Sequence, residues 1–244
     1  MPARATASTA ERILRQLRHD KRTVALLLVL PAVLLTNVWA MYDGRHHSFN
    51  RVGLALLGLF PFITMFLVTS VAMLRERTTG TLERFLTLPP GKADLLFGYG
   101  LAFGTAAVAQ AAVATTLACG PLGLDAGNPV IAALVAVASA VLGVALGLLC
   151  SAFARSEFQA VQFMPAVVLP QLLLCGLFVP REDMSSWLHA VSDVLPLTYA
   201  VDALRELSAS GGATATMWRD VAIVAATATA ALVAASTTLR RRSR

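Results

Sequence analysis

Six long apolar runs constrain the fold of this chain more than any other feature. Each is close to the roughly 20 residues that cross a bilayer as a helix, and they cover about residues 23–41, 52–74, 95–119, 130–153, 158–179 and 218–239. Only 14% of the 244 residues are charged, against about 25% in a soluble domain, so charge is too scarce to cover a water-facing surface. The sequence therefore predicts an all-α membrane protein, a single domain over residues 1–244 with six transmembrane helices.

The distribution of Lys and Arg predicts the orientation of these spans. With both termini inside, the inner segments hold 15 of them: six before position 23, four between positions 75 and 92, Arg155, and four at the C-terminus. The outer segments hold five, which are Arg45, Arg51, Arg181, Arg205 and Arg219. Short loops rich in Lys and Arg stay in the cytoplasm. We therefore expect both termini and the stretch 75–94 in the cytoplasm, and the stretch 180–217 on the outer side.

Residues 1–22 predict an N-terminal interfacial amphipathic helix. Ser8 and Glu11 match the S-x-x-E capping box, and Ile13, Leu14 and Leu17 then line one face with arginines on the other. A basic amphipathic helix of this kind lies on the anionic inner leaflet. A cleavable signal peptide is rejected, because no A-x-A-like site clearly follows the first apolar run and five more spans come after it.

Glycine and proline patterns predict how the spans pack. The G-x-x-x-G patterns at 100–104 and 143–147 let a neighbouring helix approach closely. The fifth span holds Pro165 and Pro170, which free backbone carbonyls that lipid does not tolerate. Two interpretations of the fifth span stay open: it faces the bundle interior or a pathway, or it is a kinked packing helix.

The charged stretch 75–94, R-E-R-T-T-G-T-L-E-R-F-L-T-L-P-P-G-K-A-D, predicts a short cytosolic helix between the second and third spans. Leu82, Phe85 and Leu86 stand at i, i+3 and i+4 and share one face, while Glu83 and Arg84 take the other. A helix this short is marginal alone in water. It needs either the lipid headgroup layer or a docked cytosolic protein, and an ordinary solvated loop is the alternative.

The longest polar stretch, residues 180–217, predicts one or two short amphipathic helices between the fifth and sixth spans. Apolar residues form two helical stripes there: Met184, Trp187, Leu188 and Val191, and then, after Pro196, Leu197, Val201, Leu204 and Leu207. We expect these extracytoplasmic helices to lie at the membrane face or to dip into it.

No pattern of residues predicts an enzyme. Gly91-Lys92 is not a Walker A motif, because Leu86 stands where that motif has its first glycine and Ala93 follows the lysine. The carboxylates lie in loops and not in spans, which disfavours an ion-coupled carrier. His46 and His47 are expected in a solvated loop, and the three cysteines are not spaced as ligands. We therefore expect no catalytic residue, no metal site, no nucleotide-binding domain and no nucleic-acid partner.

Two segments carry a resemblance to a known family. They are E-R-T-T-G-T-L-E-R-F-L-T-L-P, from Glu76 to Pro89, and F-V-P-R-E-D-M-S-S-W-L-H-A-V-S-D-V-L-P-L-T-Y-A-V-D-A-L-R, from Phe178 to Arg205. Together with the basic N-terminal helix they resemble the ABC-2 type permeases of bacterial ATP-binding cassette exporters, closest to the drug-resistance and daunorubicin-type permeases. The second segment departs from the family pattern, because Ser185-Ser186 stand where a second proline is expected before Trp187.

The resemblance implies roles for particular residues. The ATPase-coupling residues would be Glu76, Gly80, Thr81, Leu82, Glu83, Arg84, Phe85 and Leu86. The outer gate and extracytoplasmic helices would use Trp187, Pro196, Tyr199 and Arg205. Three glutamines could offer hydrogen bonds along a substrate path, although contacts between helices explain them equally well: Gln110, Gln162 and Gln171.

The resemblance also implies the assembly and its function. Two permease subunits, identical or paralogous, would pair with two cytosolic ABC ATPase subunits that bind ATP and Mg, and this chain itself would hold no cofactor. The complex would sit among the lipids of a bacterial plasma membrane and export a hydrophobic or amphiphilic compound, most simply a drug or antibiotic. The alternatives are a secondary carrier and an exporter of a lipid or lipid-linked glycan.

Overall fold

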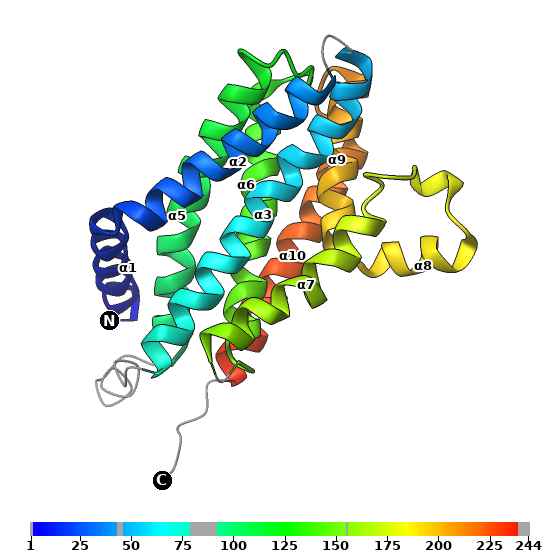
Figure 1. Ribbon diagram of the computed structural model, residues 1–244. Coiled ribbons are helices and arrows are strands. Elements are labelled where there is room, and N and C mark those ends of the chain that lie inside the picture. The colour runs from blue at the N-terminus through cyan, green and yellow to red at the C-terminus, as the bar shows by residue number, and fades with distance from the viewer. Residues whose placement is uncertain (1, 43–45, 79–91, 155, 239–244) are drawn as a thin grey trace.

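The computed structural model describes residues 2–42, 46–78, 92–154 and 156–238, and these residues are almost entirely helical (Figure 1). Six helices are long and apolar enough to cross a membrane: α2 Lys21–Tyr42, α3 His46–Thr78, α5 Lys92–Cys119, α6 Pro129–Ser151, α7 Glu157–Leu174 and α10 Ala215–Thr238. The N-terminal helix α1 spans Pro2–His19. Between α7 and α10 lie the 3₁₀ turn η1 Arg181–Asp183, α8 Ser186–Val194 and α9 Pro196–Ser210. The prediction of an all-α protein with six spans is confirmed.

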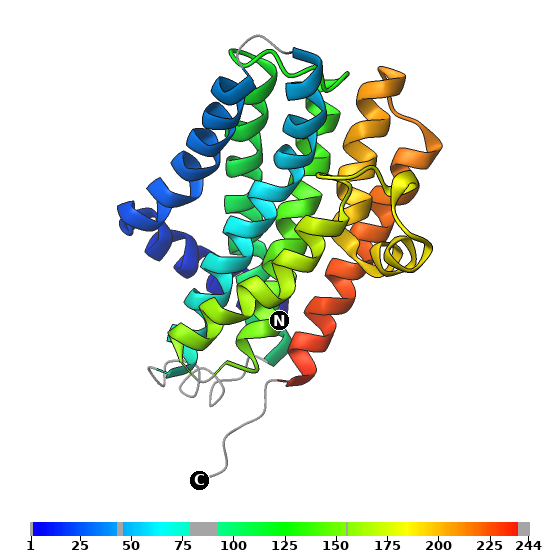
Figure 2. The same ribbon diagram turned by 45° about the vertical axis from the view of Figure 1, so that its right-hand side comes forward.

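The six long helices run side by side, and α1 leaves their direction to pack against the lower half of α5 (Figures 1 and 2). The connection between α6 and α7 and the end of α10 lie at the same end of the bundle. The connections between α5 and α6 and between α9 and α10 lie at the opposite end. Helix α8 lies beside the middle of the bundle in both views, and α9 runs from there to the upper end.

The centre of the bundle is the contact between α3 and α6, and glycines make it possible. A Cβ on Gly147 would lie 2.5 Å from the carbonyl oxygen of Phe66, and one on Gly143 would clash with the carbonyl oxygen of Phe62. The close approach expected at 143–147 is therefore confirmed. At 100–104 the contact is looser: a Cβ on Gly100 would lie 3.8 Å from Leu232 of α10, and one on Gly104 would meet no described atom within 4 Å.

The two apolar stripes between α7 and α10 have different environments. The stripe on α9 is part of the core, since Leu197, Val201, Leu204 and Leu207 are fully buried. The stripe on α8 is open, and Trp187 is 69% exposed. Few residues of α2, α7 and α10 are buried, and many more of α3, α5 and α6 are, so α3, α5 and α6 form the inner part of the bundle.

Helices α1, α3 and α7 begin or end at residues other than the predicted ones. Ser8 lies inside α1 and not at its start, so the predicted capping box is wrong, and Glu11 instead pairs with Arg15 at 2.5 Å. His46 and His47 begin α3 and do not lie in a loop. The fifth span ends at Leu174, five residues before the predicted end at position 179, because Gly176 takes a left-handed φ of 86°.

Candidate functional site

The C-terminal end of α3 carries the part of the predicted coupling segment that the structure describes. Glu76 pairs with Arg12 of α1 at 3.3 Å, and Arg12 also donates a hydrogen bond to the hydroxyl of Tyr99 on α5 at 3.4 Å. Glu76 therefore joins three helices at the point where the chain enters the stretch 79–91. The other predicted coupling residues lie outside the described residues: Gly80, Thr81, Leu82, Glu83, Arg84, Phe85 and Leu86.

Close contact between α1 and α5 holds this junction in place. A Cβ on Gly98 would lie 2.7 Å from the Cβ of Thr9, so only glycine lets α1 pack so near. Ala10 and Ile13 of α1 are buried in the same apolar cluster as Tyr99 and Phe103. Sequence reasoning missed Arg12 as a partner of Glu76, because the two are 64 positions apart and nothing in a single sequence pairs them.

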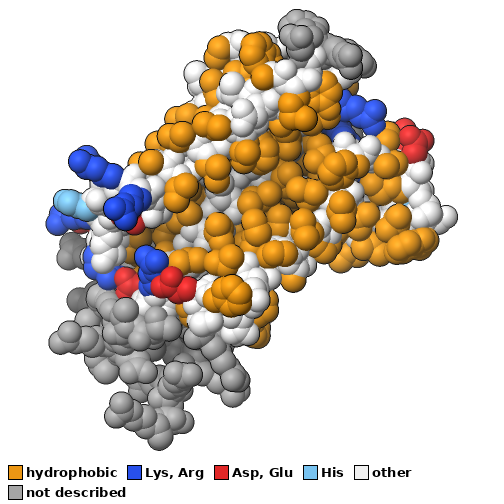
Figure 3. All heavy atoms as spheres, viewed as in Figure 1, with side chains coloured by type: hydrophobic (Ala, Val, Ile, Leu, Met, Phe, Trp, Pro, Cys, Tyr) orange, Lys and Arg blue, Asp and Glu red, His pale blue; other side chains and the backbone are white. Residues whose placement is uncertain are grey.

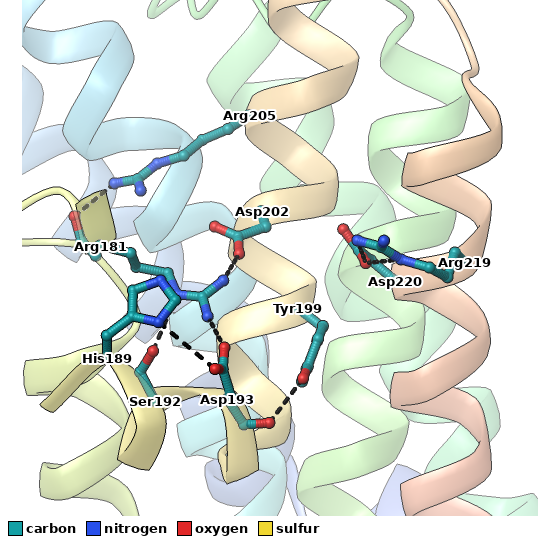
Figure 4. Close-up of polar contacts among 10 residues, drawn as sticks. Arg181, His189, Ser192, Asp193, Tyr199, Asp202, Arg205, Arg219 and Asp220 are labelled. Atoms are coloured by element: carbon teal, nitrogen blue, oxygen red, sulfur yellow. Dashed lines mark hydrogen bonds and ion pairs between the residues drawn. The ribbon is translucent and has the colours of Figure 1, made fainter. Parts of the chain in front are cut away.

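Arg181 organises the outer candidate site (Figure 4). Its guanidinium forms ion pairs with Asp193 of α8 and Asp202 of α9. Its Nε donates to the hydroxyl of Ser192 at 3.0 Å. The Arg181 side chain is 16% exposed, so these bonds form in a partly water-excluded place, where they are stronger than on an open surface. Arg181 therefore binds η1 and α8 to α9.

Three of the four predicted residues of the outer gate lie around this network. Pro196 begins α9, and the Tyr199 hydroxyl donates to the carbonyl oxygen of Asp193 at 2.7 Å. Arg205 donates to the carbonyl oxygen of Gly176 at 2.6 Å and so ties the end of α7 to α9. The Trp187 side chain takes no part in this network and is exposed. Tyr199 and Arg205 therefore hold the same segment, residues 176–194, that Arg181 binds. Sequence reasoning missed Arg181, although it is one of the five Lys and Arg residues predicted on the outer side.

Burial shifts the ionisation of three groups in this region. It raises the pKa of the Asp202 carboxyl, and Arg181 opposes that rise. It also lowers the pKa of the Arg205 guanidinium, an effect that Asp202 opposes. The pKa of the Cys175 thiol is raised by burial as well, so this cysteine is held as an inert thiol. Each shift follows from the cost of a charge in a medium with little water.

The three predicted substrate-path glutamines do not come together. Gln110 is buried and donates to the Thr64 hydroxyl, which joins α5 to α3. Gln171 is buried too: its Nε2 donates to the carbonyl oxygen of Val167 at 3.1 Å, and its Oε1 accepts from the backbone N–H of Leu197 at 3.2 Å. Gln162 is exposed on α7. Gln110 and Gln171 therefore make contacts between or within helices, which agrees with the second explanation given for them.

One carboxylate contradicts the prediction that carboxylates stay out of the spans. Asp220 lies in the second turn of α10 and is 3% exposed. Arg219, beside it in the sequence, pairs with it at 2.9 Å (Figure 4). Arg219 and Asp220 already lie inside the predicted span 218–239, and α10, which begins at Ala215, contains both. Within the described ranges, no group of three or more His, Cys, Asp or Glu could hold a metal ion.

Comparison with known proteins matches the chain to one family of transporters. The family model for the ABC-2 type transporter matches residues 5–208. ABC transporter G family member 20 of Dictyostelium discoideum is 28% identical over 63% of this chain and 21% of its own length. The probable multidrug ABC transporter permease YbhR of Escherichia coli is 24% identical over 68% of this chain and 46% of its own.

A third relative is the linearmycin resistance permease protein LnrN of Bacillus subtilis, 26% identical over 63% of this chain and 40% of its own length. The chain thus spans between a fifth and just under half of the length of these three curated relatives.

Proposed function

The chain belongs to the ABC-2 type transporter family, and on that premise we propose that it is the membrane-spanning permease subunit of an ATP-driven exporter in a bacterial plasma membrane. The compound exported is hydrophobic or amphiphilic, and a drug or antibiotic fits best. The family match over residues 5–208 carries this proposal, and two relatives described as multidrug and resistance permeases support the class of substrate.

The permease works in this proposal with two cytosolic ABC ATPase subunits, which bind ATP and Mg, and with a second permease subunit. The ATPases dock on residues 76–86. Glu76 passes their movement to α1 and α5 through Arg12 and Tyr99. Helix α3 transmits the movement to α6, because at Gly143 and Gly147 the two backbones pack too closely for one to shift without the other. Packed interfaces of this kind move as rigid bodies and do not deform continuously.

The outer end responds through α9. This helix is buried against the bundle, and Arg181 and Arg205 bind the segment from Gly176 to Val194 to it. A shift of α9 therefore carries α8 with it. In this proposal α8 and the residues Trp187, Pro196, Tyr199 and Arg205 form the outer gate, on the side away from the ATPases.

Two experiments test the proposal: one identifies the subunits that co-purify with the chain, and the other identifies the energy source of export. When the tagged chain is purified from membranes of its own host in a mild detergent, an ABC ATPase with a Walker A motif should co-purify with it. A deletion strain should accumulate compounds of the exported class, and the wild-type gene should reverse that only when the ATPase is active. Accumulation assays over drugs, lipids and lipid-linked glycans separate the substrate classes.

An ion-coupled carrier is the alternative function, and the observation on its side is Asp220, a buried carboxylate in α10. Its ion pair with Arg219 gives it a structural role instead. Export that collapses with an ionophore but survives an inactive ATPase would replace the exporter by this carrier.

Phe85 and Glu83 carry the coupling prediction. Phe85→Ala removes an apolar side chain whose burial in the ATPase is worth about 1.5–3 kcal/mol, and Glu83→Lys reverses a charge on the other face of the same segment. Either variant should insert normally yet separate ATP hydrolysis from export. The measurement is the ratio of compound exported to ATP hydrolysed in proteoliposomes. Wild-type export by both variants would remove the basis for assigning residues 80–86 to the ATPase.

A further inference from the structure

A cavity lies beside the inner ends of α1, α2, α3 and α5, away from the outer gate residues. Its volume is about 620 Å³, within the roughly 300–1,000 Å³ of pockets that take small ligands. One wall is a face of α3 made of Leu67, Val68, Val71, Ala72, Arg75 and Glu76. Ile13 and Leu17 of α1 and Phe103 of α5 also line it.

The α3 wall changes character along its length. Its four lining residues nearest the middle of α3 are apolar, namely Leu67, Val68, Val71 and Ala72, and the next turn brings Arg75 and Glu76. At 1.5 Å of rise per residue, the wall runs for about 13 Å from its apolar end to its charged end. A cavity with this gradient suits a molecule that has an apolar tail and a polar head.

The charges at the polar end select the sign of the head. Arg75 pairs with Glu157 at 2.8 Å and Glu76 pairs with Arg12 at 3.3 Å, so each carries its own counter-charge. Asp20 lines the same end, and no Lys or Arg of the described residues lies within ion-pair distance of it. Its carboxylate accepts from the hydroxyl of Thr23 at 2.6 Å and from the backbone N–H of Thr23 at 3.1 Å. The Thr23 hydroxyl, followed by that N–H, holds the pKa of Asp20 below its usual value, and the more distant charge of Arg75 adds to the effect, so the carboxylate is ionised at neutral pH.

The cavity is placed where an amphiphile of the membrane can reach it. Helix α1 packs mainly on α5 and makes far less contact with α2. Figure 3 shows Lys, Arg, Asp and Glu side chains gathered at the lower left of the visible face, beside continuous apolar surface. This end of the bundle holds α1, so its charged side chains lie at the depth of the lipid headgroups when the termini are inside.

We propose that this cavity binds a cationic amphiphile, with an ammonium head at Asp20 and an apolar tail along Leu67, Val68 and Val71. The site stands apart from the proposed function, because binding needs neither the ATPase nor transport. Two sources have this chemistry, an ethanolamine lipid of the inner leaflet and a soluble amphiphilic compound.

The test is photolabelling of the full chain in a non-ionic maltoside detergent. The probe has a trimethylammonium head and a diazirine in a dodecyl tail, and mass spectrometry locates the label. We expect saturable labelling on the α3 wall or at Phe103, displaced by dodecyltrimethylammonium and not by dodecyl sulfate. Displacement by phosphatidylethanolamine would identify a lipid as the occupant, and displacement by the soluble amphiphile alone would identify a soluble compound; the site stands in both cases.

Asp20→Asn is the decisive variant, because asparagine caps a helix as well as aspartate does and removes only the charge. It should weaken labelling about fivefold, the effect of one screened ion pair, with an unchanged melting temperature. Val71→Trp fills the cavity and should abolish saturable labelling. Glu11→Gln is the matched control, since Glu11 is a carboxylate on α1 that does not line the cavity. Equal labelling of wild type and Asp20→Asn, or label spread without saturation over α2 and α7, would overturn the site.

Discussion

At the scale of single residues, the glycines of α6 are the strictest positions in the bundle. Gly147→Ala places a methyl group 2.5 Å from the carbonyl oxygen of Phe66, and backbone atoms there cannot move aside as a flexible side chain would. We expect a loss of about 1–3 kcal/mol in the free energy of unfolding. Gly104→Ala is the control: its Cβ would meet no described atom within 4 Å, and it should gain up to about 1 kcal/mol from helix propensity. Thermal unfolding in detergent measures both, and equal losses would contradict the packing described.

Two buried glutamines allow the same substitution with opposite outcomes. Gln110→Leu removes a side chain whose Oε1 has no hydrogen-bond partner among the described residues, while the Thr64 hydroxyl keeps its bond to the carbonyl oxygen of Phe60. The free energy of unfolding should stay the same or rise by about 1 kcal/mol, with export unchanged.

Gln171→Leu is the comparison, because it leaves the buried N–H of Leu197 without its acceptor. It should cost about 1–3 kcal/mol, measured by the same unfolding assay. Export lost in Gln110→Leu with an intact fold would return Gln110 to the substrate path.

At the scale of elements, Arg181 determines whether α8 stays on α9. Arg181→Met leaves Asp202 in a half-buried place without its cation, and we expect a loss of roughly 3 kcal/mol together with faster amide exchange in residues 181–194. Arg15→Met breaks an ion pair with Glu11 that is exposed on both sides, so it should cost less than about 1 kcal/mol.

A second substitution separates the two effects of Arg181. Asp202→Asn, added to Arg181→Met, should recover part of the stability because it removes the unpaired charge, while α8 stays mobile. Hydrogen exchange read by mass spectrometry follows α8 directly, and unchanged exchange in Arg181→Met would show that α8 is held by something else.

The elements could be predicted from the sequence where periodicity decides them, and not where one long-range contact does. The six spans are confirmed because apolar length alone specifies a membrane helix. The end of α7 was missed because the apolar run continues to Val179, while Gly176 leaves the helix with a left-handed φ. Arg205, 29 positions away, holds the carbonyl oxygen of Gly176 there. The start of α1 was missed because Ser8 fits a local cap rule, while α1 is held by packing on α5 at Gly98.

At the scale of the whole molecule, the two ends of the bundle are built differently, which one sequence can predict only in part. The number of Lys and Arg residues in the loops predicts which end of the bundle faces the cytoplasm, because this charge bias is summed over many loops and depends on no single contact. The Arg12–Glu76–Tyr99 junction at one end and the Arg181 network at the other depend on how helices distant in sequence meet. The rigid contact of α3 with α6 connects the two ends, so the proposed coupling requires that they face opposite sides of the membrane.

That requirement is tested by cysteine labelling. In a background where Cys119, Cys150 and Cys175 are alanine, Phe85→Cys reports the inner end and Ala213→Cys reports the exposed connection between α9 and α10. A membrane-impermeant maleimide should label Ala213→Cys in intact cells, and it should label Phe85→Cys only after permeabilisation. The physical reason is the excess of Lys and Arg on the Phe85 side, which the membrane potential and the anionic inner leaflet hold in the cytoplasm. The reverse pattern would place residues 76–86 out of reach of any cytosolic ATPase, and the proposed coupling would fall with it.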